Sequence, residues 1–173
     1  MPRKFILAPF LLLATCALAQ PDSLYITTQG TTQAYAIAYA PVQPVERYRR
    51  VGNYAFDTTR TAVTIDYKRG KPSGIYRAFY PDGKQLLFAV YGWGSLHGDW
   101  AEYGPDGRIT VKGQYRQGKR EGTWAFREQG IVGHYKDGQQ HGKWKYYENG
   151  KLVKREKWRK GEMKQGGTFL FGW

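Results

Sequence analysis

Apolar and polar residues alternate along most of this chain with a period of two. From Ile109 the sequence reads Ile-Thr-Val-Lys-Gly-Gln-Tyr, so Ile109, Val111 and Tyr115 share one face and the polar residues share the other. The preceding stretch has apolar residues at the matching positions, Leu87, Ala89 and Tyr91. Few stretches show helical periodicity, so the pattern predicts a protein built from half-buried β-strands.

The alternating segments are punctuated by a glycine that precedes an aromatic residue by two positions. This glycine recurs at intervals of 22, 24, 24, 20 and 25 residues, at Gly52, Gly74, Gly98, Gly122, Gly142 and Gly167. A second phrase, aromatic-x-x-Gly, recurs before the last five of these, beginning at Tyr67, Tyr91, Tyr115, Tyr135 and Trp158. Such self-similarity predicts a row of equivalent units that bury a continuous core by stacking on one another.

Each unit also contains a turn signal between its two strands. Residues 81–83 and 105–107 read Pro-Asp-Gly, 148–150 reads Glu-Asn-Gly, and 128–130 reads Glu-Gln-Gly, a weaker signal. Asp-Gly and Asn-Gly favour two-residue hairpin turns, because these turns require positive φ at both positions. Each unit is therefore predicted to be strand, hairpin turn and strand, followed by a glycine-bracketed turn into the next unit.

The region before the repeats has a different pattern. Residues 20–50 contain predicted strands around Leu24–Thr28 and Ala34–Tyr39, followed by two prolines and a basic Arg-Tyr-Arg-Arg stretch. Because a repeat array usually needs an atypical cap to cover its end, we interpret this region as an N-terminal cap, with a partly mobile arm as the alternative. The repeat domain is predicted to span residues 51–173.

The last units depart from the common pattern. The unit over residues 122–141 is three residues shorter between its turn and its tyrosine, which predicts a short second strand. In the unit that begins at Gly142, Lys154 and Glu156 occupy positions that are apolar or glycine elsewhere. Two charged side chains on the buried face should weaken packing, so we expect a frayed or half-solvated end of the sheet there.

The joint between successive units has the form Tyr-x-x-Gly-x-x-x-Gly-x-aromatic, as in "YRQGKREGTW" and "YKDGQQHGKW". This phrase resembles the MORN repeat, and the interposed Asp-Gly or Asn-Gly hairpin resembles the bacterial MORN-variant repeat family, over about residues 52–171. The resemblance implies an all-β fold, an elongated twisted antiparallel meander of MORN-like β-hairpin repeats. It also implies a role as a scaffold or binding platform, and members of the family often carry the label of an antitoxin component of toxin–antitoxin systems.

The first residues have the layout of a secretory signal peptide over residues 1–19. A basic start is followed by an apolar run over Phe5–Leu13 and small residues up to a cleavage site after Ala19. We therefore expect a protein exported to the periplasm or secreted. The alternatives are a retained N-terminal anchor and lipoprotein anchoring through Cys16, the only cysteine. Cleavage after Ala19 leaves no cysteine, which excludes disulfides and thiol chemistry.

The chain is strongly basic. It has 27 Lys and Arg against 14 Asp and Glu, and loss of the signal segment would still leave a net charge of +11. Such a charge favours an acidic partner. We expect an acidic envelope polymer or saccharide or an unknown protein, with an anionic membrane surface as a further alternative, while nucleic acid fits the charge but not export. The oligomeric state is not predicted.

No arrangement of polar residues in the sequence indicates catalysis. His97 and His141 recur at the same position before a repeat glycine, and His134 has no evident partner, so we interpret all three as surface or structural residues. Four further polar residues lie in or beside glycine turns, where they cap local backbone: Asp82, Asp106, Asp137 and Asn149. We expect no enzymatic activity, no cofactor and no metal site.

The candidate binding surface combines basic turns with neighbouring rings. Regular stacking would bring the turns between units to one edge of the sheet. The predicted residues are Lys68, Arg69, Lys71, Tyr91, Tyr115, Arg116, Lys119, Arg120, Tyr135, Lys136, Arg159 and Lys160. The sequence thus predicts an exported, non-enzymatic MORN-variant repeat protein that acts as a binding or scaffold platform at the cell envelope. The alternative is an antitoxin-like protein that neutralises a toxin by direct binding.

Overall fold

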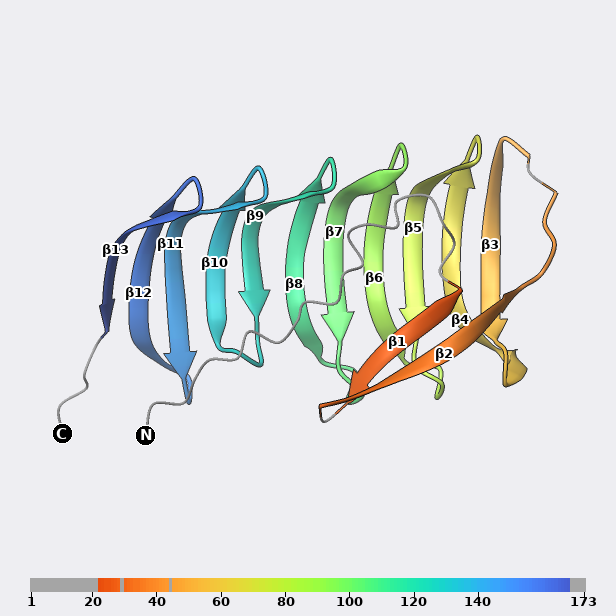
Figure 1. Cartoon of the computed structure of the whole chain (residues 1–173), viewed down its shortest axis with the longest axis horizontal. Coiled ribbons are helices and arrows are strands. Elements are labelled where there is room, and N and C mark those ends of the chain that lie inside the picture. The colour runs from red at the N-terminus through yellow and green to blue at the C-terminus, as the bar shows by residue number, and fades with distance from the viewer. Residues whose placement is uncertain (1–21, 29, 44, 169–173) are drawn as a thin grey trace.

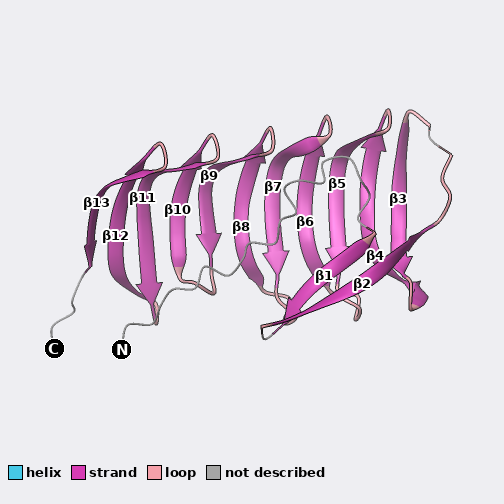
Figure 2. Ribbon diagram, viewed as in Figure 1, coloured by secondary structure: helices cyan, strands magenta, loops and turns pink. Residues whose placement is uncertain are grey.

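The computed structural model describes residues 22–28, 30–43 and 45–168. Within these ranges the chain forms thirteen β-strands and no helix (Figure 1, Figure 2). The strands are β1 (Ser23–Thr28), β2 (Thr31–Tyr39), β3 (Arg47–Tyr54), β4 (Asp57–Lys68), β5 (Lys71–Phe79), β6 (Gln85–Gly92), β7 (Ser95–Tyr103), β8 (Ile109–Arg116), β9 (Lys119–Phe126), β10 (Ile131–Lys136), β11 (Gln139–Glu148), β12 (Lys151–Arg159) and β13 (Glu162–Thr168).

Each strand pairs antiparallel with its neighbours in sequence, so the order in the sheet repeats the order in the chain. The predicted all-β class and the elongated meander of hairpins are confirmed. The predicted signal segment 1–19, with Cys16, and the aromatic residue at 169 lie outside the described residues. Across the described ranges, the structure contains no helix with the length and apolarity needed to cross a membrane.

The turns alternate between two edges of the sheet (Figure 1). The upper edge, as drawn in Figure 1, holds the turns at residues 69–70, 93–94, 117–118, 137–138 and 160–161. The lower edge holds those at 55–56, 80–84, 104–108, 127–130 and 149–150. All five upper-edge turns have positive φ at both residues, as two-residue primed turns require.

The prediction of two-residue primed turns at the Pro-Asp-Gly sequences is wrong. At residues 80–84 only Gly83 has positive φ, at 86°, and its N–H donates to the Tyr80 carbonyl at 2.9 Å. The Gly83 bond to Tyr80 makes Pro81 and Asp82 the central residues of the turn, and the fixed φ of proline, near −65°, suits the first of these positions in an ordinary rather than a primed turn. The chain instead forms a longer turn with a single left-handed glycine. Asn149 and Gly150, which lack a proline, do form the primed pair.

The repeat aromatics within the described residues lie on one face of the sheet, which we call the aromatic face. The Gly-x-aromatic phrases supply the buried rings Tyr54, Tyr76, Trp100, Trp124 and Trp144. The aromatic-x-x-Gly phrases supply the rings between them, and from Trp100 to Trp158 successive ring centroids lie 5.1 to 6.5 Å apart. Edge-on and tilted contacts at these distances are those that aromatic pairs prefer. The predicted register of evenly spaced rings therefore holds.

Glycines inside the strands make room for these rings. A Cβ at Gly113 would lie 2.2 Å from two atoms of the Trp124 indole, and one at Gly133 would lie 2.3 Å from Trp144. Each indole thus lies flat on bare backbone of the neighbouring strand. Its N–H donates to a carbonyl beside that glycine: Trp124 to Gln114 at 3.1 Å and Trp144 to His134 at 3.2 Å.

The N-terminal residues form a hairpin that crosses diagonally in front of the sheet in Figure 1. β2 pairs with β3 over only three residue pairs, from Ile37 to Tyr39, and β1 pairs with β2. Leu24 and Ile26 of β1 are buried within the core cluster, and Ile37 contacts Gly52 on the aromatic face. The hairpin therefore covers the N-terminal part of that face.

The C-terminal end of the sheet is more regular than the sequence indicated. β12 pairs along its length with both β11 and β13. Glu156 is buried, only 7% exposed, and its carboxylate accepts hydrogen bonds from the Tyr146 hydroxyl at 2.6 Å and the Trp158 indole at 2.8 Å. Lys154 completes the site with an ion pair at 2.6 Å. The charge is compensated rather than solvated, so the expected half-solvated end is not observed at Glu156.

Candidate interaction surface

Backbone hydrogen bonds hold each upper-edge turn against the repeat before it. Gly94 donates to the Pro72 carbonyl at 2.9 Å, Gly118 to Leu96 at 2.8 Å, Gly138 to Arg120 at 2.9 Å and Gly161 to Gln140 at 3.0 Å. The same donor position recurs in these four turns, and in the turn at 69–70 Arg69 donates instead to the Glu46 carbonyl at 2.8 Å. Side chains on this edge are therefore presented at the spacing of the repeats.

The two edges differ in charge. The lower-edge turns and their flanking residues hold four cations and five acids, Lys84, Arg108, Arg127 and Lys151 with Asp57, Asp82, Asp106, Glu128 and Glu148. The upper-edge turns and flanking residues hold eight cations and two acids, Lys68, Arg69, Lys71, Arg116, Lys119, Lys136, Arg159 and Lys160 with Asp137 and Glu162. Charge of one sign along one edge creates a field that attracts anions.

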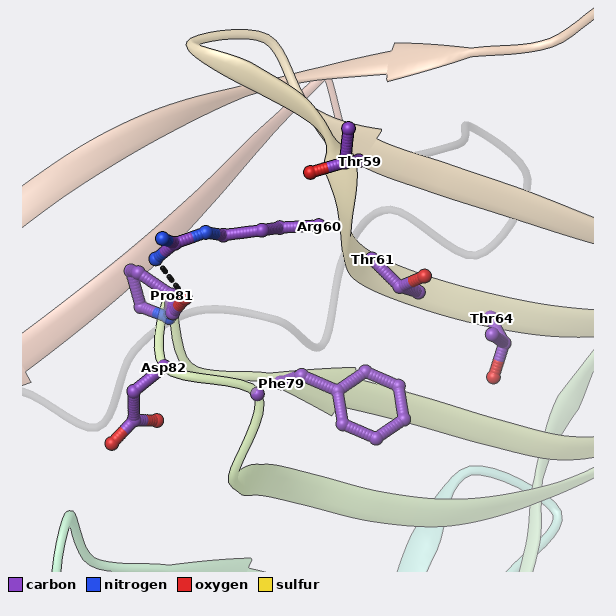
Figure 3. A pocket seen from close by; sticks show the side chains of 8 residues that line it. Thr59, Arg60, Thr61, Thr64, Phe79, Pro81 and Asp82 are labelled. Carbon is purple, nitrogen blue, oxygen red and sulfur yellow. Dashed lines mark hydrogen bonds between the residues drawn. The ribbon is translucent and has the colours of Figure 1, made fainter.

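Ion pairs hold cations of the lower edge against its acids. Lys84 pairs with Asp82 at 2.9 Å within one turn, and Arg60 pairs with Asp57 at 2.8 Å. A groove of about 750 Å³ lies beside them, and Figure 3 shows the Arg60 guanidinium reaching across it to the Pro81 carbonyl at 2.8 Å. Its lining combines a phenylalanine ring with threonine hydroxyls and an aspartate that is paired with a lysine.

The structure brings most of the predicted binding residues together. Seven predicted cations are exposed on the upper edge: Arg69, Lys71, Arg116, Lys119, Lys136, Arg159 and Lys160. Lys68 is half-buried at the same edge. Of these eight, Arg69 forms an ion pair, with Glu46 at 3.3 Å, and both partners are well exposed. Exposed pairs of this kind contribute little to stability, so the cations remain accessible to an anion.

The predicted rings are less accessible than the cations. Tyr91, Tyr115 and Tyr135 are half-buried in the aromatic face. Arg120 turns onto this face as well: its guanidinium lies 4.5 Å from the Trp124 ring centroid and donates to the Tyr135 hydroxyl at 3.1 Å. These four residues therefore stabilise the ring packing, and an anion at the upper edge would meet the other cations first.

A second group of cations, not included in the predicted surface, lies on the face opposite the aromatic one. On β11 and β12, Lys143 stands directly opposite Lys157, and Lys145 stands opposite Arg155. All four are exposed. Like charges directly opposite each other destabilise a sheet, so a bound anion would relieve repulsion here. Exposed cations occupy every second position of β12 from Arg155 through Lys157 to Arg159. Arg159 lies at the upper edge, so this group of cations is continuous with those of the upper edge.

An exposed tryptophan at the upper edge was also missed. Trp93 is 77% exposed and occupies the first position of its turn, where the other repeats have Arg69, Gln117, Asp137 and Lys160. The sequence signal was present, because Trp93 precedes Gly94 as these residues precede their own glycines. Only the turn register shows that the indole belongs to the same row as the cations.

Two carboxyl groups on the aromatic face have shifted pKa values. Burial raises the pKa of Glu102, although it accepts a hydrogen bond from the Trp100 indole at 2.9 Å. Burial also tends to raise the pKa of Glu156, but hydrogen bonds from Lys154, Tyr146 and Trp158 outweigh it and hold that pKa below its ordinary value. Both carboxylates accept hydrogen bonds from aromatic side chains packed on this face, so their surroundings are those of acids that take part in packing.

The histidines do not converge. The rings of His134 and His141 lie 6.4 Å apart on the face opposite the aromatic one, and His97 is exposed on β7. All three lie on strands rather than in turns. Among the residues that the structure describes, no three His, Cys, Asp or Glu side chains are grouped so that they could hold a metal ion.

Comparison with protein-family models finds none that matches this chain, and comparison with curated proteins finds no similar sequence. The similarity to MORN-variant repeats therefore rests on the repeat phrases themselves.

Proposed function

We propose that this chain is an exported, non-enzymatic repeat protein of the MORN-variant type that binds an acidic polymer at the cell envelope. The meander would be a rigid platform, and the upper edge would be its contact surface. The expected signal segment supports a location outside the cytosol. The packed, ring-lined environments of Glu102 and Glu156 favour a place in the packing of the aromatic face over a role in catalysis.

The observation that carries this proposal is the asymmetry between the edges. Both edges are made of short turns from the same repeats, yet there are eight cations and two acids on the upper edge and four cations and five acids on the lower edge. Sequence drift on a merely solvated surface would not separate the charges by edge. A linear polyanion running along the upper edge could contact a basic turn in four of the five repeats.

The C-terminal hairpin extends this surface. Residues 136–164 hold ten Lys and Arg against four Asp and Glu, and one of those acids, Glu156, is buried on the other face. The opposed pairs Lys143–Lys157 and Lys145–Arg155 add a patch of positive charge beside the upper edge. A polyanion that runs along the upper edge would therefore meet further cations at this end of the sheet.

The test is binding of the purified, natively processed protein to an acidic polysaccharide and to anionic vesicles, from about 30 mM to about 0.5 M salt. We expect affinity for the polysaccharide that falls steeply with salt. A variant with Lys71, Arg116 and Lys119 changed to Gln should bind more weakly. The matched control changes Lys84, Arg108 and Arg127 of the lower edge to Gln and loses the same charge.

Three results would overturn the proposal. The first is absence of polysaccharide binding at low salt, and the second is equal loss of affinity in the upper-edge and lower-edge variants. The third is binding to anionic vesicles alone, which would assign the surface to a membrane. A stoichiometric complex with one protein, without affinity for any acidic polymer, would instead favour the antitoxin-like alternative.

A further inference from the structure

Trp93 has an unusual position for a large aromatic residue. Its φ is 54°, in the left-handed region that bulky side chains rarely adopt, and its side chain is 77% exposed. The turn itself does not need an indole, because Gln117 and Asp137 form the equivalent turns. Strain at such a residue and exposure of an apolar ring both cost free energy, and such outliers cluster at binding sites.

The indole borders a groove of about 670 Å³ at the upper ends of β3, β4 and β5. This volume is within the range of small-ligand sites. Lys68 and the exposed Arg47 also line the groove, and the Lys68 ammonium lies 5.5 Å from the Trp93 ring centroid. Ser73 contributes a hydroxyl to the same lining.

A fixed carboxylate lies in the groove wall. Asp66 accepts hydrogen bonds from the Arg49 Nε at 2.6 Å and Nη2 at 3.2 Å, and from the Ile75 backbone N–H at 3.2 Å. A carboxylate has about four acceptor positions, so one remains for a ligand. The bonds from Arg49 hold the pKa of Asp66 below its ordinary value, so the carboxylate is ionised at neutral pH.

We propose that this groove binds one sugar ring of an anionic polysaccharide, a pyranose that carries a carboxylate. The apolar C–H face of the ring would cover the Trp93 indole, its carboxylate would meet Lys68 and Arg47, and its hydroxyls would donate to Asp66 and bind Ser73. The inference rests on the proposed function, because it names the class of acidic polymer that the upper edge binds and the groove that recognises one of its sugar rings.

The groove favours a sugar over a phosphodiester for a chemical reason. Asp66 is an acceptor, so it needs a ligand hydroxyl or amine opposite it, and a phosphate group would place negative charge there instead. A pyranose offers several hydroxyls around one apolar face. A nucleobase could stack on Trp93, but the sugar-phosphate linking it would bring few donors to Asp66 and Ser73.

The experiment measures binding of the natively processed protein to three probes. They are an oligogalacturonide, the same oligomer fully methyl-esterified, and inorganic polyphosphate, which has charge but no rings. The variants are Trp93→Gln and Lys68→Gln, with Gln117→Asn as the control at the equivalent turn position of the next repeat. The chemical shift of the Trp93 indole N–H reports contact directly, and thermal unfolding verifies that each variant is folded.

We expect Trp93→Gln to weaken oligogalacturonide binding by about tenfold, the factor that corresponds to covering one indole face. Binding of polyphosphate should be unchanged in Trp93→Gln. Lys68→Gln should reduce the preference for the acidic over the esterified oligomer, and Gln117→Asn should behave as the native chain. Native affinity in Trp93→Gln, or an equal loss for polyphosphate, overturns the sugar subsite while leaving the charged platform in place. Failure of the native chain to bind either acidic probe at low salt overturns both proposals.

Discussion

Replacing Gly113 with alanine tests directly whether glycine is needed beneath the rings. Gly113 lies in β8 with ordinary strand φ, so alanine meets no backbone penalty at this position. Its Cβ, however, would lie 2.2 Å from two carbons of the Trp124 indole, and Trp124 is fully buried. The substitution therefore isolates one variable, the clash of a single methyl group with a ring.

The loss of stability can be estimated from the distance that the Trp124 indole must move to relieve the clash. An ordinary contact begins near 3.4 Å, so the indole must move by about 1.2 Å. Overpacking of this kind costs about 1–3 kcal/mol. A moving ring also loses its N–H bond to the Gln114 carbonyl, a further loss of about 1 kcal/mol. We expect Gly113→Ala to lower the free energy of unfolding by about 2–4 kcal/mol.

Urea unfolding followed by circular dichroism measures this difference. The matched control is Gly167→Ala, because Gly167 also lies in a strand with ordinary φ and an added Cβ there meets nothing within 4 Å. The control should unfold within about 0.5 kcal/mol of the native chain. Equal stability of Gly113→Ala and Gly167→Ala would refute the account of rings seated on bare backbone.

Three further substitutions test the charges on the aromatic face. Because burial raises the pKa of Glu102, ionisation of this carboxyl group opposes folding above the unfolded-state pKa. Glu102→Gln should therefore be more stable than the native chain at pH 7. Urea titrations should show this gain in stability disappear below about pH 4. Glu156 has a lowered pKa, so its contribution to stability is present above the unfolded-state pKa and is lost as pH falls through the folded-state pKa. Glu156→Gln should cost about 1–3 kcal/mol at pH 7 and less in acid. A cost independent of pH would argue against the ion pair with Lys154. Arg120→Met should cost about 1 kcal/mol in the same assay, through lost contact with the Trp124 ring, while binding to acidic polymers should stay close to native.

The ring ladder could be predicted from the sequence because two regular signals agree. The spacing of Gly-x-aromatic gives the position of each ring along the chain, and the period of two gives its face. Tyr54, Tyr76 and Trp124 are therefore buried on one face as expected. The gathering of Lys71, Arg116 and the other turn cations on one edge followed from the same register, since alternate turns of a meander return to the same side.

Other features depend on contacts between strands that no local pattern specifies. Glu156 looked like a break in the buried face, but donors from Tyr146 on β11 and Trp158 beside it make burial of the carboxylate tolerable. Arg120 was predicted as an exposed edge cation, yet it packs on the Trp124 ring because the Tyr135 hydroxyl of β10 accepts a hydrogen bond from its guanidinium. The path of the N-terminal hairpin across the sheet has no sequence signal, because it depends on tertiary packing alone.

The most direct test of the central claim is retention of the protein on washed cell envelopes isolated from its own host. The bound fraction is measured for the native chain, for the upper-edge variant with Lys71, Arg116 and Lys119 changed to Gln, and for the matched lower-edge variant. The account predicts that the native chain and the lower-edge variant remain bound at low salt and elute as salt rises, while the upper-edge variant is largely released. Equal retention of the two variants, or retention of the native chain that salt does not reverse, would contradict it.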